Sequence, residues 1–302
     1  YRHTGVCNRD MTAIAVDPTT PAILYAADAA NGPFRTIDGG SSWTLANTGL
    51  TGGGRSILTL VVDPVTATTV YAGTSAGVWR SLDSGGTWTS LGLPGSAPVR
   101  AVVIDRTAPS TVFVGTSGGV QVTTNGGGSW TTANIGLTNL DVQALVAEPT
   151  DPATLYVGSR GGGAFKSTTA GASWFTINAG LTSLTVVVNV VVDPLVPTRL
   201  YASTFSGFFR STDSGAMWSP AQTGLGGPFS TTLAFDSTTP GTLYAGHVLG
   251  VFKSTTAGTT WFAVNHGIQG LDIEGLAVDP MSPATVYATN NGGVYKTTTG
   301  GQ

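Results

Sequence analysis

The feature that most constrains the fold is an internal repeat of about 43 residues, which runs through nearly the whole chain. Each copy has an acidic residue at the end of an apolar run and an aromatic residue eight positions later, and six copies also have a tryptophan further on. Because three independent series share one spacing, we predict seven similar units. The acidic series is Asp17, Asp63, Asp105, Glu148, Asp193, Asp236 and Asp279. The aromatic series is Tyr25, Tyr71, Phe113, Tyr156, Tyr201, Tyr244 and Tyr287, and the tryptophans are Trp43, Trp88, Trp130, Trp174, Trp218 and Trp261.

Each copy of the repeat has the pattern of four short strands. In the second copy the first strand is the apolar run Leu58 to Val62, and Asp63-Pro64 begins a turn, because proline cannot continue a ladder. The second strand centres on Tyr71, the third covers Val78 to Ser81, and a glycine turn leads to a fourth that starts at Trp88. Runs of β-formers between turn residues indicate strands, and no helical period is present. The chain is therefore predicted to be all-β.

Seven four-stranded antiparallel units arranged round an axis make a seven-bladed β-propeller. Neighbouring units then cover the sheet faces that a single unit cannot bury, and closure of the ring leaves few exposed edges. We predict one domain, 1–302, with blades at approximately 7–50, 51–95, 96–138, 139–182, 183–226, 227–268 and 269–302 plus 1–6.

The two ends of the chain are expected to share the last blade. The seventh copy stops at Gln302, before its tryptophan, whereas Gly5 lies twelve residues before Asp17 in the way that Gly136 precedes Glu148. We therefore expect the segment from residue 1 to residue 6 to form the fourth strand beside residues 295–299, with about three residues of the repeat unaccounted for.

Composition excludes several classes of function. Charged residues are only 10% of the chain but 41% is hydrophobic, so we expect a packed core and not disorder. The net charge is −3 and no basic tract exists, which argues against a nucleic-acid partner. The run Val186 to Val192 is far too short to span a bilayer, so no membrane insertion is expected. Cys7 is the only cysteine, which excludes an internal disulfide, and we expect it to be a small buried or strand-end residue.

The turn between the third and fourth strands resembles the Asp-box, S/T-x-D-x-G-x-x-W. The three full matches are Thr36-Ile-Asp38-Gly-Gly40-Ser-Ser-Trp43, Ser81-Leu-Asp83-Ser-Gly85-Gly-Thr-Trp88, and Ser211, Asp213, Gly215 and Trp218. With the repeated strand pattern, it makes the chain similar to the BNR/Asp-box repeat superfamily, which includes sialidases, the sortilin family, photosystem II assembly factors and xyloglucanase-type glycoside hydrolases. The resemblance covers nearly the whole chain and implies a propeller, but a fold does not determine a function.

We interpret the Asp-box residues as structural. A short acceptor side chain can satisfy turn amides, and tryptophan can pin the turn to the sheet. Asn125 replaces the aspartate once, and Thr169, Thr256 and Thr299 replace it in the other copies. This patchy conservation of the carboxylate between copies fits a stabilising turn better than a chemical site. The expected structural set is Asp38, Asp83, Asn125, Asp213, Trp43, Trp88, Trp130, Trp174, Trp218 and Trp261.

The candidate binding site consists of polar residues that depart from the repeat. Up-and-down strand order puts the second-to-third and fourth-to-first connections on one face of the disc, here called the loop face, and the first-to-second and third-to-fourth turns on the other, here called the turn face. Most of the acidic residues outside the repeat series fall on the loop face, where variable loops on a rigid scaffold carry function. We expect a ligand there, near the central channel and toward blades 6, 7 and 1. The candidates are Asp28, Asp10, Asp272, Glu274, His247, Asn290 and Asn291, with Arg100 opposite.

These residues favour binding over catalysis. The preferred hypothesis is a secreted bacterial, extracellular or cell-surface module that binds a glycan or a protein or self-assembles into a larger structure. The alternative is a glycoside hydrolase or a glycan-binding lectin of xyloglucanase-like ancestry, since the segment around Asp28 is similar to the loop that carries one catalytic aspartate in that family. Glycoside hydrolysis needs a pair of carboxyls, and Asp272 or Glu274 would have to face Asp28. No cofactor is implied; a weak Ca²⁺ site at the acidic residues is compatible with the sequence but not required by it.

Overall fold

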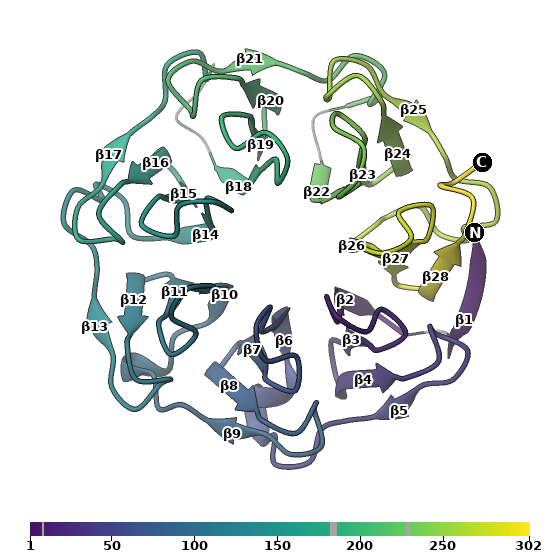
Figure 1. Ribbon diagram of the computed structural model, residues 1–302, viewed down its shortest axis with the longest axis horizontal. Helices are drawn as coiled ribbons and strands as arrows, with labels where there is room; N and C mark the ends of the chain where they lie inside the picture. Colours follow the sequence, from purple (N-terminus) through teal and green to yellow (C-terminus); the bar gives the residue numbers. More distant parts are fainter. Residues whose placement is uncertain (8, 182–185, 228–229) are drawn as a thin grey trace.

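The computed structural model describes residues 1–7, 9–181, 186–227 and 230–302. Over these residues the chain forms seven four-stranded antiparallel sheets around a central axis (Figure 1). The predicted seven-bladed β-propeller is confirmed, and helix in the described chain is limited to the short 3₁₀ turns η1 (Gly52–Arg55) and η2 (Pro94–Ser96). None of the described helices has the length and apolarity needed to cross a membrane.

Each blade runs from an inner strand at the axis to an outer strand at the rim (Figure 1). The inner strands are β2 (Met11–Val16), β6 (Ile57–Val62), β10 (Val99–Ile104), β14 (Val142–Ala147), β18 (Val187–Val192), β22 (Ser230–Phe235) and β26 (Gly275–Val278). The second strands are β3 (Leu24–Asp28), β7 (Val70–Thr74), β11 (Val112–Thr116), β15 (Leu155–Ser159), β19 (Leu200–Thr204), β23 (Leu243–His247) and β27 (Val286–Asn290).

The third strands begin at a glycine that closes the preceding hairpin. They are β4 (Gly32–Thr36), β8 (Gly77–Ser81), β12 (Gly119–Thr123), β16 (Gly163–Ser167), β20 (Gly207–Ser211), β24 (Gly250–Ser254) and β28 (Gly293–Thr297). The outer strands β5 (Thr44–Leu45), β9 (Thr89–Ser90), β13 (Thr131–Thr132), β17 (Phe175–Thr176), β21 (Ser219–Pro220) and β25 (Phe262–Ala263) each have two residues, whereas β1 (Arg2–Cys7) has six. Such short edges offer little backbone for pairing with another chain.

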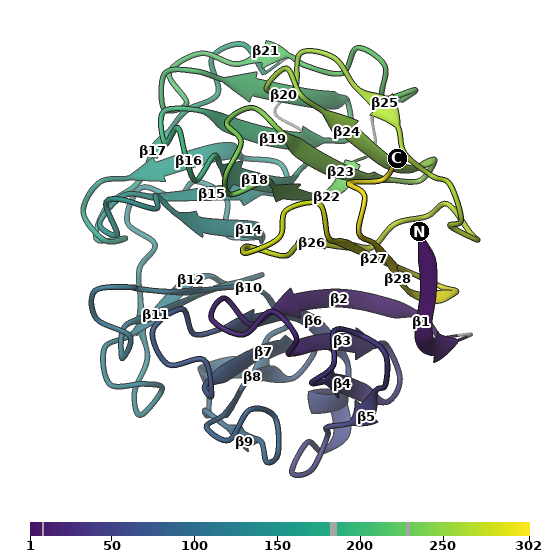
Figure 2. The same cartoon turned by 45° about the vertical axis from the view of Figure 1, so that its right-hand side comes forward.

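The N-terminal strand closes the ring, as predicted. β1 pairs antiparallel with β28, so the two chain ends lie in the same blade (Figure 2). Arg2 lies opposite Lys296 and His3 opposite Tyr295, and the register shifts before Cys7 pairs with Gly293. Cys7 thus ends a strand, as expected, whereas the burial of its side chain falls outside the described features.

Tyr1 takes the position in the seventh blade that tryptophan holds in the others. The Tyr1 amino group donates to the carbonyl oxygen of His266, as the backbone N–H of Trp218 donates to Ala179. Gly267 contacts Tyr1 in the way that Gly136 contacts Trp174, so Tyr1 is the equivalent of the tryptophan and the alignment of Gly5 with Gly136 is wrong. One position of the repeat, and not about three, is missing between Gln302 and Tyr1. Counting residues back from Asp17 misaligned this strand, because the connection from the fourth strand of the last blade to the first blade is shorter than the same connection between the other blades.

Neighbouring blades are joined by a cation from the third strand. Arg80 donates to Gly126 O at 2.7 Å, and Lys253 to Gly300 O at 3.2 Å, each in the Asp-box turn of the next blade. Lys296 donates to Gly39 O at 2.9 Å and thereby ties the last blade to the first. In three of the blades the ammonium also lies 5.3 Å from the centre of a buried tyrosine ring, a cation–π contact.

The Asp-box turns are closed by hydrogen bonds to the short polar side chain. Asp83 Oδ1 accepts the Thr87 N–H at 2.8 Å and the Ser81 hydroxyl at 2.7 Å, and these bonds lower the pKa of Asp83 to about 2. Asn125 accepts the Ser129 N–H at 2.9 Å in the same way. The ring of Trp218 is buried and its Nε1 donates to Ile177 O in the preceding blade, whereas Trp130 is only partly buried.

Candidate functional site

A β-bulge at the loop-face end of the inner strands aims one side chain per blade toward the axis. In blades 1 to 6 the pairing of the inner strand shifts by one residue, so a single residue is left without a ladder partner. Bulges re-aim side chains in this way next to functional sites. The bulged residues with described side chains are Thr12, Leu58, Arg100, Gln143 and Val188. Each of these residues lies five positions before the turn acid of its blade. Glu274 lies at the same distance from Asp279, just before β26 begins.

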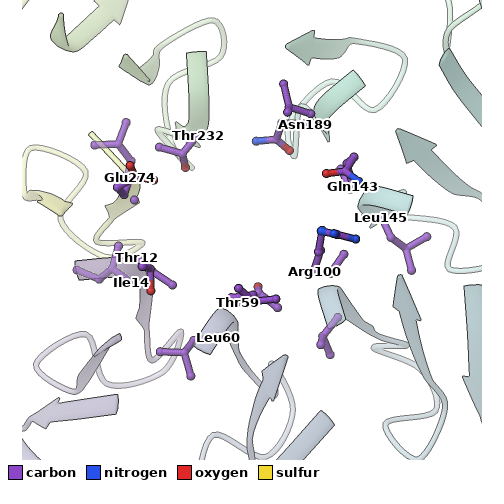
Figure 3. A pocket seen from close by; sticks show the side chains of 18 residues that line it. Thr12, Ile14, Thr59, Leu60, Arg100, Gln143, Leu145, Asn189, Thr232 and Glu274 are labelled. Atoms are coloured by element: carbon purple, nitrogen blue, oxygen red, sulfur yellow. The ribbon is translucent and has the colours of Figure 1, made fainter. Parts of the chain in front are cut away.

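These residues surround a cavity of about 300 Å³ at the loop-face mouth of the central channel. Figure 3 shows polar side chains on every side of it, with Glu274 and Arg100 on opposite sides. Each blade contributes one polar residue, and leucine, isoleucine, valine, alanine and glycine fill the remaining lining. The polar residues are Thr12, Thr59, Arg100, Gln143, Asn189, Thr232 and Glu274. The site therefore offers hydrogen-bond donors and acceptors around its whole circumference.

On the side of blades 3 and 4 the charge is neutralised within the protein. Arg100 Nη1 lies 3.1 Å from Asp141 Oδ1, and both side chains are about one third exposed, at 31%. Gln143 Nε2 donates to the same oxygen at 2.8 Å. Asp141 thus orients both donors at the cavity wall and cancels the formal charge of the arginine.

On the side of blades 7 and 1 are three carboxylates, which we call the acidic arc: Asp10, Asp272 and Glu274, of which only Glu274 lines the cavity. All three are exposed, but Glu274 is partly enclosed by the channel wall. Loss of hydration there, and then the charges of Asp272 and Asp10, raise the pKa of Glu274. None of the three forms a hydrogen bond or ion pair through its side chain with a described residue.

Asp28 does not line the cavity; it is buried and closes the β3–β4 hairpin. Its Oδ1 accepts the N–H groups of Ala30 and Asn31 at 2.9 and 2.7 Å, and Arg9 Nη1 lies 3.3 Å from Oδ2. Burial alone would raise the pKa of Asp28, but these hydrogen bonds hold it below its usual value. Asp28 is therefore held as a carboxylate by the turn.

His247 and Asn290 hold the same turn position in blades 6 and 7. His247 Nδ1 accepts the Leu249 N–H at 3.0 Å, and Asn290 Oδ1 accepts the Gly292 N–H at 2.7 Å. Both side chains are buried, and burial lowers the pKa of His247 while nearby Asp272 opposes the shift. Asn291, at the exposed tip of its hairpin, does not line the cavity either.

The described residues contain no group of three or more His, Cys, Asp or Glu side chains placed to hold a metal ion. The carboxylates of the acidic arc influence one another electrostatically without converging on one point. Among the residues that the structure describes, the arc is therefore a region of negative potential and not a metal-binding cage.

Sequence reasoning singled out Glu274 and Arg100 but missed three polar neighbours at the next position of the repeat. Thr59, Asn189 and Thr232 lie four residues before their turn acids, one position after the bulge. A search of this second series along the repeat would have found them. Asp141 was not among the candidates from the sequence, and only the structure shows that it pairs with Arg100 of the neighbouring blade.

Comparison with known proteins finds likeness at the level of structure. No family model matches the chain, and neither does any of the curated proteins searched. The GH74 xyloglucanase from Xanthomonas campestris superposes with a TM-score of 0.80 at 16% identity, over 98% of this chain and 53% of that one. An ancestral GH74 enzyme gives 0.78 at 17% identity, over 96% and 45%. YCF48 from Cyanidioschyzon merolae gives 0.71 at 13% identity, over 98% and 97%.

At these identities the likeness shows the fold alone. The chain spans about half the length of the GH74 structures, at 45% and 53%. The matched proteins include a xyloglucanase, one of the kinds that the Asp-box resemblance names, so the resemblance and the solved structures indicate the same propeller fold.

Proposed function

We propose that this propeller is a non-catalytic binding module whose ligand sits over the channel mouth on the loop face. The observation that carries the proposal is the cavity of about 300 Å³ into which every blade projects one polar side chain. A concave site with a few convergent polar groups is the usual form of a ligand site. Bulges on rigid inner strands hold the lining groups in place, and such pre-organisation favours specific binding.

A glycan or protein ligand outside the cell is the class that we propose. One matched structure is an extracellular domain, that of BT4673 from B. thetaiotaomicron, with a TM-score of 0.76 at 16% identity over 98% of this chain and 39% of that one. Another is YCF48 bound to D1 peptide, so a propeller of this shape can bind a peptide. Low charge, absence of a basic tract and the hydroxyl- and amide-rich lining suit both ligands better than a nucleic acid.

Screening the protein against a glycan array and a peptide library tests this proposal. A double variant, Glu274→Ala with Gln143→Ala, should lose the hits, because it removes one polar group from each side of the cavity. The control is Asp83→Asn, which removes a carboxylate from the turn face. Hits that survive the double variant but disappear in the control would move the ligand to the opposite face and refute the proposal. Ordered self-association without any ligand would instead favour an architectural role.

Glycoside hydrolysis remains the second candidate, because Glu274 has the raised pKa of a general acid and two carboxylates as neighbours. Asp28, the residue similar to a family catalytic aspartate, is buried in its turn. Hydrolysis of xyloglucan or another β-glucan that is abolished by Glu274→Gln would establish this alternative. Binding without turnover, lost in the same variant, would support the binding module.

A further inference from the structure

The central channel has a second mouth on the turn face, and its chemistry differs from that of the loop-face mouth. A cavity of about 430 Å³ opens there among the first-to-second turns of blades 1 to 4. Val102 and Leu145 line this cavity and also the cavity at the loop face, so the two lie at opposite ends of one channel. Every blade gives a polar side chain to the loop-face mouth, whereas the turn-face mouth has mainly apolar walls. The turn-face mouth is therefore a separate site with its own preference for ligands.

The walls of the turn-face cavity are the ends of four inner strands and the prolines beyond them. Its apolar lining includes Val62, Ile104, Leu145, Pro18, Pro64 and Pro149. Water against such walls cannot hydrogen-bond to them, so an apolar group that displaces this water gains binding free energy. A cavity of about 430 Å³ lies within the usual size range of small-molecule sites. The walls therefore favour a small ligand with an apolar group.

Two charged side chains also line this cavity, and they do not pair with each other. Arg106 is exposed, and its guanidinium forms no hydrogen bond or ion pair with another described residue. Glu148 uses one oxygen within its turn, where Oε1 accepts the Thr150 N–H at 2.8 Å, and its other oxygen has no partner in the described chain. The turn acids of blades 1 to 3 do not line the cavity. The rim thus holds one cation and one carboxylate oxygen that a ligand can contact.

A ligand that matches this rim carries one charge of each sign beside its apolar group. A neutral apolar molecule leaves both rim charges without a partner, and a residue at a peptide terminus compensates only one of them. An α-amino acid carries its ammonium and its carboxylate on the same carbon, and its side chain extends away from both. The side chain can therefore enter the channel while the two charged groups stay at the rim. A carboxylate also matches the planar fork of an arginine.

We propose that the turn-face mouth of the channel binds a free α-amino acid with a large apolar side chain. Its carboxylate lies against Arg106 and its ammonium against Glu148, and its side chain packs on the valines, isoleucine and leucine of the channel wall. This site is separate from the ligand site proposed for the loop face. Each of the two can therefore be tested, and can fail, without the other.

The test is titration calorimetry of the full chain with L-leucine and L-phenylalanine at neutral pH. At least one of them should bind, and at least tenfold more tightly than three matched probes. The probes are its amide, which lacks the carboxylate, its N-acetyl form, which lacks the ammonium, and L-serine, which lacks the apolar side chain. Arg106→Gln should abolish the preference over the amide, and Glu148→Gln the preference over the N-acetyl form.

The variants are chosen to leave the turns intact. Glu148→Gln keeps Oε1 as the acceptor of the Thr150 N–H, and Arg106 is exposed. The control Asp236→Asn removes a carboxylate from the same turn position in blade 6, outside the cavity, and should change neither preference. Circular dichroism checks that all three variants are folded.

Four outcomes would overturn the amino-acid proposal. The first is that neither amino acid binds, and the second is that any of the three probes binds as tightly as the amino acid. The third is that both preferences survive in the folded Arg106→Gln and Glu148→Gln variants. The fourth is that Asp236→Asn abolishes them as well, since the effect would then come from the overall charge of the turn face. The probe comparison uses the unaltered chain, so it decides the matter even if a variant does not fold.

Discussion

The last residue of each second strand accepts a hydrogen bond from a backbone N–H of the following hairpin in all seven blades, although the accepting side chains differ. Thr74 Oγ1 accepts the Ala76 N–H at 3.1 Å, and Thr116 accepts that of Gly118 at 3.0 Å. Asp28, His247 and Asn290 do this with a carboxylate, an imidazole and an amide. A buried acceptor is needed there because the hairpin N–H groups would otherwise lose their hydrogen bonds. A residue that departs from the repeat at this position is therefore explained by its role as the hydrogen-bond acceptor that closes the turn.

Replacement of Asp28 should be tolerated when the acceptor is kept. Asp28→Ala leaves the N–H groups of Ala30 and Asn31 without an acceptor and should lower the free energy of unfolding by about 1–3 kcal/mol. Asp28→Thr, which installs the residue found in blades 2, 3 and 5, should cost clearly less. Urea unfolding of both variants checks this, and ligand binding should survive in each. Equal losses for alanine and threonine would contradict the turn-closing role.

Glu274 should cost stability when it is charged. Because its pKa is raised in the fold, the folded state binds its proton more tightly than the unfolded state, and stability falls as pH rises through that window. Glu274→Gln should therefore raise the free energy of unfolding at neutral pH and have no such effect below the ordinary pKa of glutamate. Asp83→Asn should behave oppositely, with a loss at neutral pH that fades as the pH falls toward about 2, because the pKa of Asp83 is lowered. Unfolding curves at several pH values that show the same sign for both variants would contradict the assignment.

At the scale of the strand and its turn, the tryptophan joins one blade to the preceding one. Trp218 Nε1 donates to Ile177 O at 2.7 Å, and Trp130 Nε1 to Leu91 O at 3.0 Å. The two rings differ in burial, however, since only that of Trp218 is buried. The two tryptophans hold the same position in the repeat, so their spacing in the sequence does not distinguish them.

Trp218→Ala should destabilise the protein by about 3–5 kcal/mol, the usual cost of a buried aromatic side chain lost. Trp130→Ala should cost less, because part of the ring is already in water. Thermal and urea unfolding of the pair measure the difference. A Trp130→Ala loss as large as that of Trp218→Ala would show that the hydrogen bond, common to both, matters more than burial.

At the scale of the whole molecule, stability depends on closing the ring between the last blade and the first. Tyr1, in the strand that completes the last blade, fills the tryptophan position and packs against Tyr244 and Val264 of the sixth blade. Its buried hydroxyl has no hydrogen-bond partner, and burial raises the pKa of Tyr1. Lys296 and Gly39 provide a polar tie between the last blade and the first. The last blade thus keeps the architecture of the others, but the Tyr1 hydroxyl and, where β1 meets the first blade, Trp43 Nε1 are buried without a hydrogen-bond partner.

Tyr1→Phe should therefore leave the free energy of unfolding unchanged or raise it slightly, because it removes a buried group whose hydrogen bond is not made. Tyr1→Ala should lower it, since it empties the slot that tryptophan fills in other blades. The comparison is made by urea unfolding. A loss above about 1 kcal/mol for Tyr1→Phe would reveal a partner for the hydroxyl.

The sequence by itself determined the number of blades, the four strands in each and the Asp-box turns that join the outer two strands. Those features depend on local chemistry, on proline and glycine at turns and on apolar runs, and they repeat at one spacing, so each copy supports the reading of the others. Glu274 and Arg100 were found in the same way, because position within the repeat determines which inner-strand residues approach the axis.

Only the tertiary structure decided which polar side chains contact one another and which are hydrogen-bonded within turns. Asp28 and Glu274 are both acids at positions that depart from the repeat, yet Asp28 is buried with three donors from its turn and a fourth from Arg9, whereas Glu274 faces the cavity without a partner. Arg100 meets Asp141 from the next blade, 41 residues away, and Tyr1 meets Gly267 across the whole chain. Pairing between strands and between blades sets these contacts, and it depends on bulges and register that no local pattern of residues specifies.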